Sequence, residues 1–134
     1  MKIQDFFESV GKGGCLSMCY IKAVNKDITE TEMFNVLWKA AAMGIINAED
    51  ECFVADAIAL MRLVNPNKKY TVIKQSISSL DDLNGKLAAV SFKHMGYNHF
   101  VLVEDGKIIF NSLEDSKCVK NGKPTTARII KIEE

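Results

Sequence analysis

The hydrophobic pattern of the chain changes character about halfway along its 134 residues. In the first half, apolar residues recur every three or four positions, which is the spacing of half-buried helices. In the second half, short runs rich in β-branched residues are separated by Asn-Gly and Asp-Gly pairs, as in antiparallel hairpins. Helices followed by a meandering sheet predict an α+β fold, with N-terminal helices packed on a C-terminal antiparallel sheet.

Three helices are predicted in the first half. The first begins at Gly14 or Cys15, after a glycine-rich stretch that we interpret as a flexible loop. The second begins after Thr29, which has the spacing of a capping box with Glu32, and the third covers residues 50–64. We assign the apolar stripes of all three to the core, and the stripe of the second helix contains Met33, Phe34, Leu37, Trp38 and Ala41.

Five strands are predicted in the second half, at "KYTVIK", "KLAAVSF", "HFVLV", "KIIF" and "ARIIKI". The pairs Asn84-Gly85, Asp105-Gly106 and Asn121-Gly122 are interpreted as turns. No repeat or low-complexity linker interrupts the chain, and 48% of its residues are hydrophobic. We therefore expect a single domain over residues 1–134.

Composition argues against several functional classes. The 17 basic and 17 acidic side chains balance, so nothing indicates a nucleic-acid or acidic-membrane partner. No apolar run reaches the length of a membrane span, and acids interrupt the N-terminal segment where a signal peptide would be apolar. We expect a reduced, cytoplasmic protein without a cofactor. We expect no metal site, because Cys15 and Cys19 lack a second pair of ligands at metal-binding spacing.

Cys15 is the candidate nucleophile. It is expected at a helix N-terminus, where backbone N–H groups and the helix dipole favour the thiolate. Cys19 is the alternative, although a thiol inside a helix lacks those N–H groups. We interpret Cys19 and Cys52 as inert apolar groups and Cys118 as an exposed residue of a polar loop.

His99 is the candidate base, because it begins a predicted strand, whereas we interpret His94 as a solvated loop residue. A three-residue turn over 104–106 would place Asn111 directly opposite His99, where it could hold the imidazole. A two-residue turn would break this pairing. Asp115 is a second choice for the orienting residue.

The order Cys, His, Asn is that of papain-like cysteine peptidases. The stretches "GGCLSMCYIKA", "YNHFVLVEDGKIIFNSLEDS" and "VKNGKPTTARIIKI" resemble compact bacterial and phage members of that fold, similar to the peptidase domains that process bacteriocin leaders. The resemblance implies a hydrolase that acts on a peptide or isopeptide bond of a peptide or protein substrate. It implies Cys15 as nucleophile, His99 as general base and Asn111 as orienting residue.

Two positions depart from the papain-like pattern. Ser9 stands where such enzymes place the glutamine of the oxyanion hole, so Gln4 or the Cys15 N–H group is the candidate donor. Leu16 follows the nucleophile where the leader-processing enzymes have glycine. Two other interpretations therefore stay open, a papain-like binding module without turnover and an unrelated α+β interaction or inhibitor domain.

Overall fold

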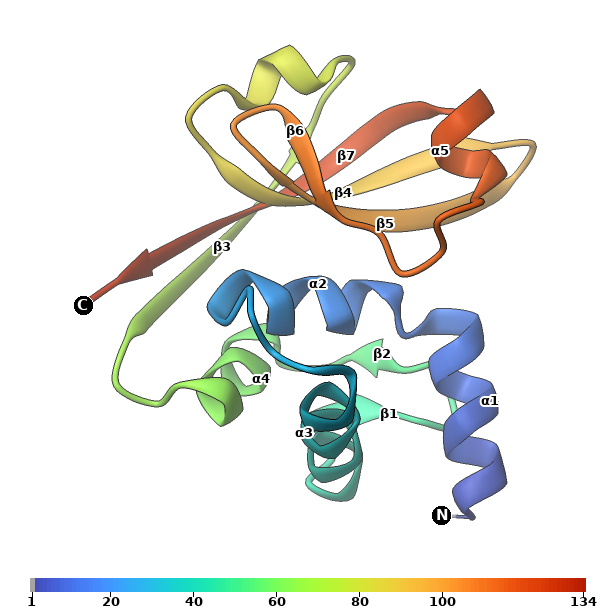
Figure 1. Ribbon diagram of the computed structural model, residues 1–134, viewed down its shortest axis with the longest axis vertical. Coiled ribbons are helices and arrows are strands. Elements are labelled where there is room, and N and C mark those ends of the chain that lie inside the picture. The colour runs from blue at the N-terminus through green and yellow to red at the C-terminus, as the bar shows by residue number, and fades with distance from the viewer. Residues whose placement is uncertain (1) are drawn as a thin grey trace. The chain divides into compact units, whose positions relative to one another are not determined.

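The structure is a computed structural model that describes residues 2–134. It consists of two compact units, residues 2–68 together with Glu134 (unit 1) and Lys69–Glu133 (unit 2). Unit 1 is mainly helical, and unit 2 contains a five-stranded antiparallel sheet (Figure 1). The predicted α+β class is confirmed.

Unit 1 contains four helices and one short hairpin. The elements are α1 (Ile3–Gly13), α2 (Cys15–Val24), α3 (Glu30–Ala42), β1 (Ile46–Asn47), β2 (Phe53–Val54) and α4 (Ala57–Val64). Each helix buries a stripe of side chains at helical spacing. The largest fully buried side chains of these helices are Cys19, Ile21, Leu37, Leu60 and Met61.

The helix boundaries confirm some predictions and correct others. The capping box of Thr29 and Glu32 begins α3 as predicted. The prediction of a loop for the glycine-rich stretch is wrong, because this stretch forms the end of α1. The predicted start of the third helix at residue 50 is also wrong. Helix α4 begins only at Ala57, because the side chain of Asp56 accepts a hydrogen bond from the Ala59 N–H group at 3.0 Å.

Two aromatic residues of α3 are more exposed than the helical pattern predicts. Phe34 is 38% exposed and Trp38 is 42% exposed, so their assignment to the core is wrong. The ring of Trp38 packs edge-on against Phe6 of α1 with centroids 5.0 Å apart, and Phe34 lies 5.9 Å from Phe7. These four residues form the aromatic cluster of unit 1, which is partly open to solvent.

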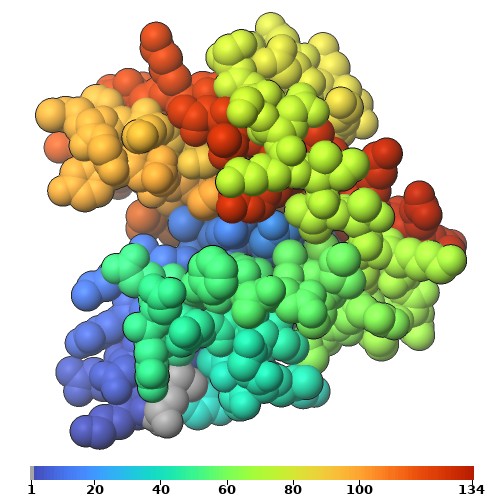
Figure 2. Space-filling view, turned by 180° about the vertical axis from the view of Figure 1, so that it is seen from behind, coloured from blue at the N-terminus to red at the C-terminus, as the bar shows by residue number. Residues whose placement is uncertain are grey.

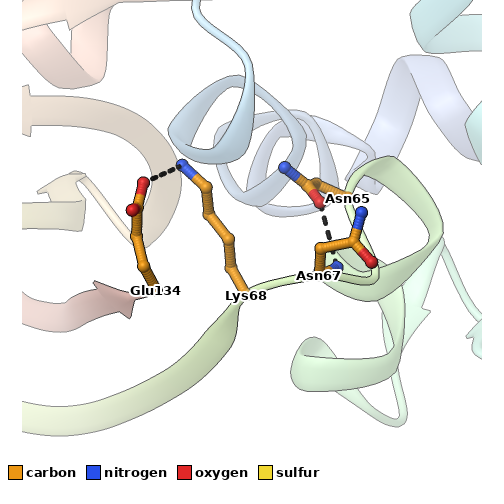
Figure 3. A network of polar contacts seen from close by, with 4 residues as sticks. All are labelled: Asn65, Asn67, Lys68 and Glu134. Carbon is orange, nitrogen blue, oxygen red and sulfur yellow. Dashed lines mark hydrogen bonds and ion pairs between the residues drawn. The ribbon is translucent and has the colours of Figure 1, made fainter.

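Unit 1 ends in a short polar network (Figure 3). The side chain of Asn65 accepts a hydrogen bond from the Asn67 N–H group at 3.0 Å, a turn that follows α4. Lys68 Nζ lies 3.8 Å from the Glu134 carboxylate. Because Glu134 is almost fully exposed, this ion pair stabilises the fold by at most about 1 kcal/mol.

Unit 2 is a sheet in which every pair of neighbouring strands is antiparallel. Its elements are β3 (Lys69–Ser76), the 3-10 helix η1 (Leu80–Leu83), β4 (Leu87–His94), β5 (Tyr97–Glu104), β6 (Lys107–Phe110), α5 (Lys117–Asn121) and β7 (Lys123–Glu133). The strand order is β3-β7-β4-β5-β6, and Figure 2 shows β3 and β7 side by side in yellow-green and red. All five predicted strands are present. The loop assignment of His94 is wrong, because this residue ends β4.

One face of the sheet is covered by η1 and α5, which lie on the same side of it (Figure 1). Side chains of β4, β5 and β7 on this face form a hydrophobic cluster with both helices. Cys118 of α5 belongs to this cluster and is 9% exposed, so its prediction as an exposed loop residue is wrong. The interpretation of Asn121-Gly122 as a turn is also wrong, because Asn121 ends α5. Gly122 has extended backbone, and a Cβ atom there would lie 2.4 Å from the Lys93 carbonyl oxygen.

Within residues 2–134, no helix is both long enough and apolar enough to cross a membrane.

Candidate active site

The structure brings two of the predicted site residues together in unit 2. His99, the third residue of β5, is buried at 4% exposure. Its Nε2 atom lies 2.7 Å from the Oδ1 atom of Asn111, which directly follows β6. The predicted His99–Asn111 contact is therefore present.

A second hydrogen bond determines which way the Asn111 amide points. The Leu113 N–H group donates to Asn111 Oδ1 at 3.0 Å, so this atom is the oxygen of the side chain. Because Oδ1 can only accept, His99 Nε2 must carry the hydrogen that it donates. In the neutral imidazole, Nδ1 then carries the lone pair and can take up a proton. Residue types alone did not identify Leu113, although an Asn side chain commonly accepts a hydrogen bond from the N–H group two residues on, in an Asx turn.

The turn that leads to Asn111 differs from the predicted one. It has two central residues, Asp105 and Gly106, with φ of +51° and +77°, and it pairs Glu104 with Lys107. The predicted three-residue turn is wrong. Asp105 tolerates the left-handed conformation, and its Oδ1 atom accepts a hydrogen bond from the Gly85 N–H group at 2.7 Å.

A β-bulge explains why the contact forms even though the predicted register is wrong. The ladder between β5 and β6 shifts between Leu102 and Val103, where Ile109 is the extra residue. Continued without a shift, the ladder would place Asn111 opposite Phe100, on the other face from His99. With the bulge, Asn111 follows Phe110 onto the face of His99, and its side chain reaches the imidazole diagonally.

Cys15 belongs to unit 1, where it begins α2 as predicted and is partly exposed. Gly14 separates the last residue of α1, Gly13, from the first residue of α2. Gly14 N–H donates to Val10 O and Met18 N–H donates to Gly14 O, both at 2.9 Å. The first N–H groups of a helix have no carbonyl partner within that helix, and in α2 these are the N–H groups from Cys15 onward. These N–H groups point along the N-terminal end of α2 and favour a negative charge there.

The junction between α1 and α2 is held by the loop that joins β1 and β2. A Cβ atom on Gly13 would overlap the Glu51 carbonyl oxygen, so only glycine permits this approach. Ser9 Oγ donates to Cys52 Sγ at 3.3 Å, and Ser17 Oγ donates to the Cys52 carbonyl oxygen at 3.5 Å. Glu51 and Cys52 both have positive φ, of 48° and 56°, which aims the loop at the junction.

Two other thiols of unit 1 are poorly suited to act as nucleophiles, because burial disfavours their charged form. Burial raises the pKa of Cys19 well above its ordinary value, and the neighbouring Cys15 raises it further. Burial also raises the pKa of Cys52, and the hydrogen bond from Ser9 partly offsets this effect. Their interpretation as buried apolar groups is confirmed by their exposures of 0% and 1%.

The predicted oxyanion donor Gln4 lies in the first turn of α1, where its side-chain amide approaches Glu8 at 3.5 Å. The nine residue-to-residue steps from Gln4 to Gly13 span about 13 Å of helix, so Gln4 is at the opposite end of α1 from Cys15. Of the two predicted oxyanion donors, the main-chain N–H group of Cys15 is therefore nearer to the Cys15 sulfur than the Gln4 side chain is. The second-choice orienting residue Asp115 forms an ion pair with Lys120 at 3.2 Å.

Within residues 2–134, no group of three or more His, Cys, Asp or Glu side chains is arranged to hold a metal ion.

The family model described as "Protein of unknown function, DUF261" matches residues 1–132. The chain belongs to this family. The searches of curated proteins and of solved structures give no match.

Proposed function

We propose that this DUF261 protein is a papain-like thiol hydrolase that cleaves a peptide or isopeptide bond. Cys15 is the nucleophile, His99 the general base and Asn111 the residue that orients the imidazole. The observation that supports this assignment is the 2.7 Å contact between His99 Nε2 and Asn111 Oδ1. Together with the Leu113 N–H bond, it leaves Nδ1 of His99 ready to accept a proton.

In the proposed reaction, His99 Nδ1 takes the proton of the Cys15 thiol, and the sulfur attacks the carbonyl carbon of the substrate. The imidazolium then gives this proton to the leaving amine as the carbon–nitrogen bond breaks. Water hydrolyses the thioester that remains, with His99 again acting as base. Asn111 Oδ1 stabilises the imidazolium of each step, because it accepts the Nε2–H bond in both charge states.

The N–H groups at the start of α2 provide a partial positive charge, which can stabilise the negative charge that develops during the reaction. The Cys15 N–H group is the proposed donor to the oxyanion. Cys15 is partly exposed, in contrast to the buried Cys19 and Cys52. The proposal requires the Cys15 sulfur to lie within about 4 Å of His99 Nδ1 when substrate is bound.

Brief alkylation with iodoacetamide at pH 6 to 8, followed by peptide mapping, tests the dyad. Cys15 should be labelled at least about tenfold faster than the other three thiols, because it is partly exposed and they are buried. The raised pKa of Cys19 and of Cys52 should keep both slow over this pH range. His99→Ala should slow Cys15 labelling, whereas His94→Ala, the matched control, should leave it unchanged. Equal labelling of Cys15 in both variants would refute the role of His99.

A second candidate function is a protein-interaction module without turnover. The partly exposed aromatic cluster of α1 and α3 favours it, because exposed Phe and Trp side chains are enriched at binding surfaces. Substitution of Trp38 by Ser would abolish binding by such a module and leave Cys15 labelling unchanged. For a hydrolase, in contrast, substitution of Cys15 or His99 would abolish activity, and substitution of Trp38 would not.

A further inference from the structure

The sheet of unit 2 contains a notch where β4 ends before its neighbour β7 does. The β4–β7 ladder stops at the pair of Leu87 with Ile130, whereas β7 stays paired with β3 up to Glu133. The last three residues of β7 therefore have a paired edge toward β3 and an open edge toward β4. An open edge of this kind presents backbone N–H and C=O groups that an added strand can pair with.

The chain before β4 bends away from β7 and leaves the notch open. The Asp105 N–H group donates to the Lys86 carbonyl oxygen at 2.9 Å, and the Gly85 N–H group donates to Asp105 Oδ1 at 2.7 Å. The first bond continues the β4–β5 register by one residue, to Lys86, and the second holds Gly85 against the β5–β6 turn. Gly85 permits the bend because its φ is +73°.

A pocket of about 450 Å³ adjoins this notch and is lined by residues of β3, β7 and the start of β4. Its volume is within the usual range for ligand sites. Most of its lining is aliphatic and includes Ile73, which is 47% exposed, and Ile129. Two lysines, Lys86 and Lys131, also line the pocket, and none of its lining residues is acidic. Within residues 2–134, neither lysine has an ion-pair partner.

We propose that the notch binds the C-terminal end of an extended polypeptide from another protein. The bound segment adds two or three residues antiparallel to β7, in line with β4, and its free α-carboxylate lies between Lys86 and Lys131.

The strand directions explain this polarity. A segment antiparallel to β7 runs in the same direction as β4, so its last residue meets Lys131 next to Leu87. Its amino side then lies opposite Glu133, which favours a basic residue there. The main-chain hydrogen bonds supply affinity, the aliphatic walls accept side chains, and the two lysines select a carboxylate. This site is independent of the proposed hydrolase chemistry.

Two probe peptides of the sequence Ac-Lys-Val-Thr-Ile test the proposal, one with a free C-terminal carboxylate and one with a C-terminal amide. Titration of the full ¹⁵N-labelled chain should shift the amide signals of residues 85–87 and 130–133. The carboxylate peptide should bind about threefold to tenfold more tightly than the amide, because only it forms the charge-assisted contacts.

The double variant Lys86→Gln and Lys131→Gln should lose the preference for the carboxylate but still bind both peptides weakly. Lys123→Gln, at an exposed lysine at the other end of β7, is the matched control and should keep the preference. Equal affinity for the two peptides, signal shifts confined to other residues, or no binding at all would each overturn the proposal. A preference for the carboxylate that persists in the double variant would overturn it as well.

Discussion

The β4–β5 and β5–β6 hairpins are joined by the same kind of turn but continue differently. Both turns have two central residues with positive φ, Met95-Gly96 in the first and Asp105-Gly106 in the second. Such turns match the twist of the strands that they connect. The β4–β5 ladder then runs through eight pairs without a shift, whereas the β5–β6 ladder shifts after its second pair.

The difference shows that the turn alone does not decide which face a side chain occupies. In the regular hairpin, the faces of all residues follow from the turn. In the β5–β6 hairpin, the bulge at Ile109 exchanges the faces of the residues beyond it, and this exchange brings Asn111 to His99. The proposed base is therefore oriented by an irregularity of the sheet.

The largest effect is expected from an insertion that reverses this exchange. One alanine inserted between Phe110 and Asn111 should move Asn111 to the other face and leave the buried imidazole of His99 without its partner. The free energy of unfolding should fall by about 2–3 kcal/mol, the cost of an unpaired buried polar group together with the strained loop. Urea unfolding measures the loss, and NMR signals of the histidine ring report whether Nε2 still holds its hydrogen.

Deletion of Ile109 is the matched control. It removes the bulge but keeps Phe110 opposite Leu102, so Asn111 stays on the face of His99. The ring signals of His99 should then resemble those of the unmodified protein. If the insertion left these signals unchanged, the bulge would have no role in orienting the imidazole.

A smaller effect is expected when the β5–β6 turn loses its acceptor. Asp105→Ala removes the hydrogen bond from Gly85 and places alanine at φ of +51°. The free energy of unfolding should fall by about 1–2 kcal/mol. Asp105→Asn keeps an acceptor and tolerates the left-handed region, so it should cost clearly less in the same urea measurement. Equal losses for both variants would mean that the side-chain acceptor does not matter.

The smallest effect, and the only gain in stability, is expected at the β4–β5 turn. Met95 has φ of +48° and is 84% exposed, so its side chain contributes little packing while its backbone is strained. Met95→Gly should raise the free energy of unfolding by about 0.5–1 kcal/mol, because glycine adopts this conformation without the steric cost. Thermal unfolding would detect the gain. A loss of stability would show that Met95 makes contacts that its exposure does not reveal.

Local signals in the sequence predicted much of the fold. The Thr29–Glu32 capping box and the five β-branched runs each act within a few residues, and all of them are present. The start of α4 was misplaced because the apolar pattern extends upstream of Asp56, where the chain forms the β1–β2 hairpin instead. Met95-Gly96 was not assigned as a turn pair, because methionine carries no turn preference of its own.

The candidate site was predictable in its residues but not in its geometry. His99 and Asn111 were identified through a register that assumed the wrong turn, and the bulge compensated for the error. A bulge depends on the packing of both strands, and no residue type at Ile109 signals it. The role of Leu113 depends on a backbone N–H group, which every residue except proline possesses.

The close approach of Glu51 to Gly13 also has a consequence for the order in which unit 1 folds. Helices α1 and α2 form from contacts between residues near in sequence, on the timescale of helix formation. The loop between β1 and β2 meets their junction only after a long segment of chain, including α3, has closed on itself, and this closure has an entropic cost. We therefore expect the surroundings of the Cys15 end of α2 to be completed late, after the helix that carries the thiol already exists.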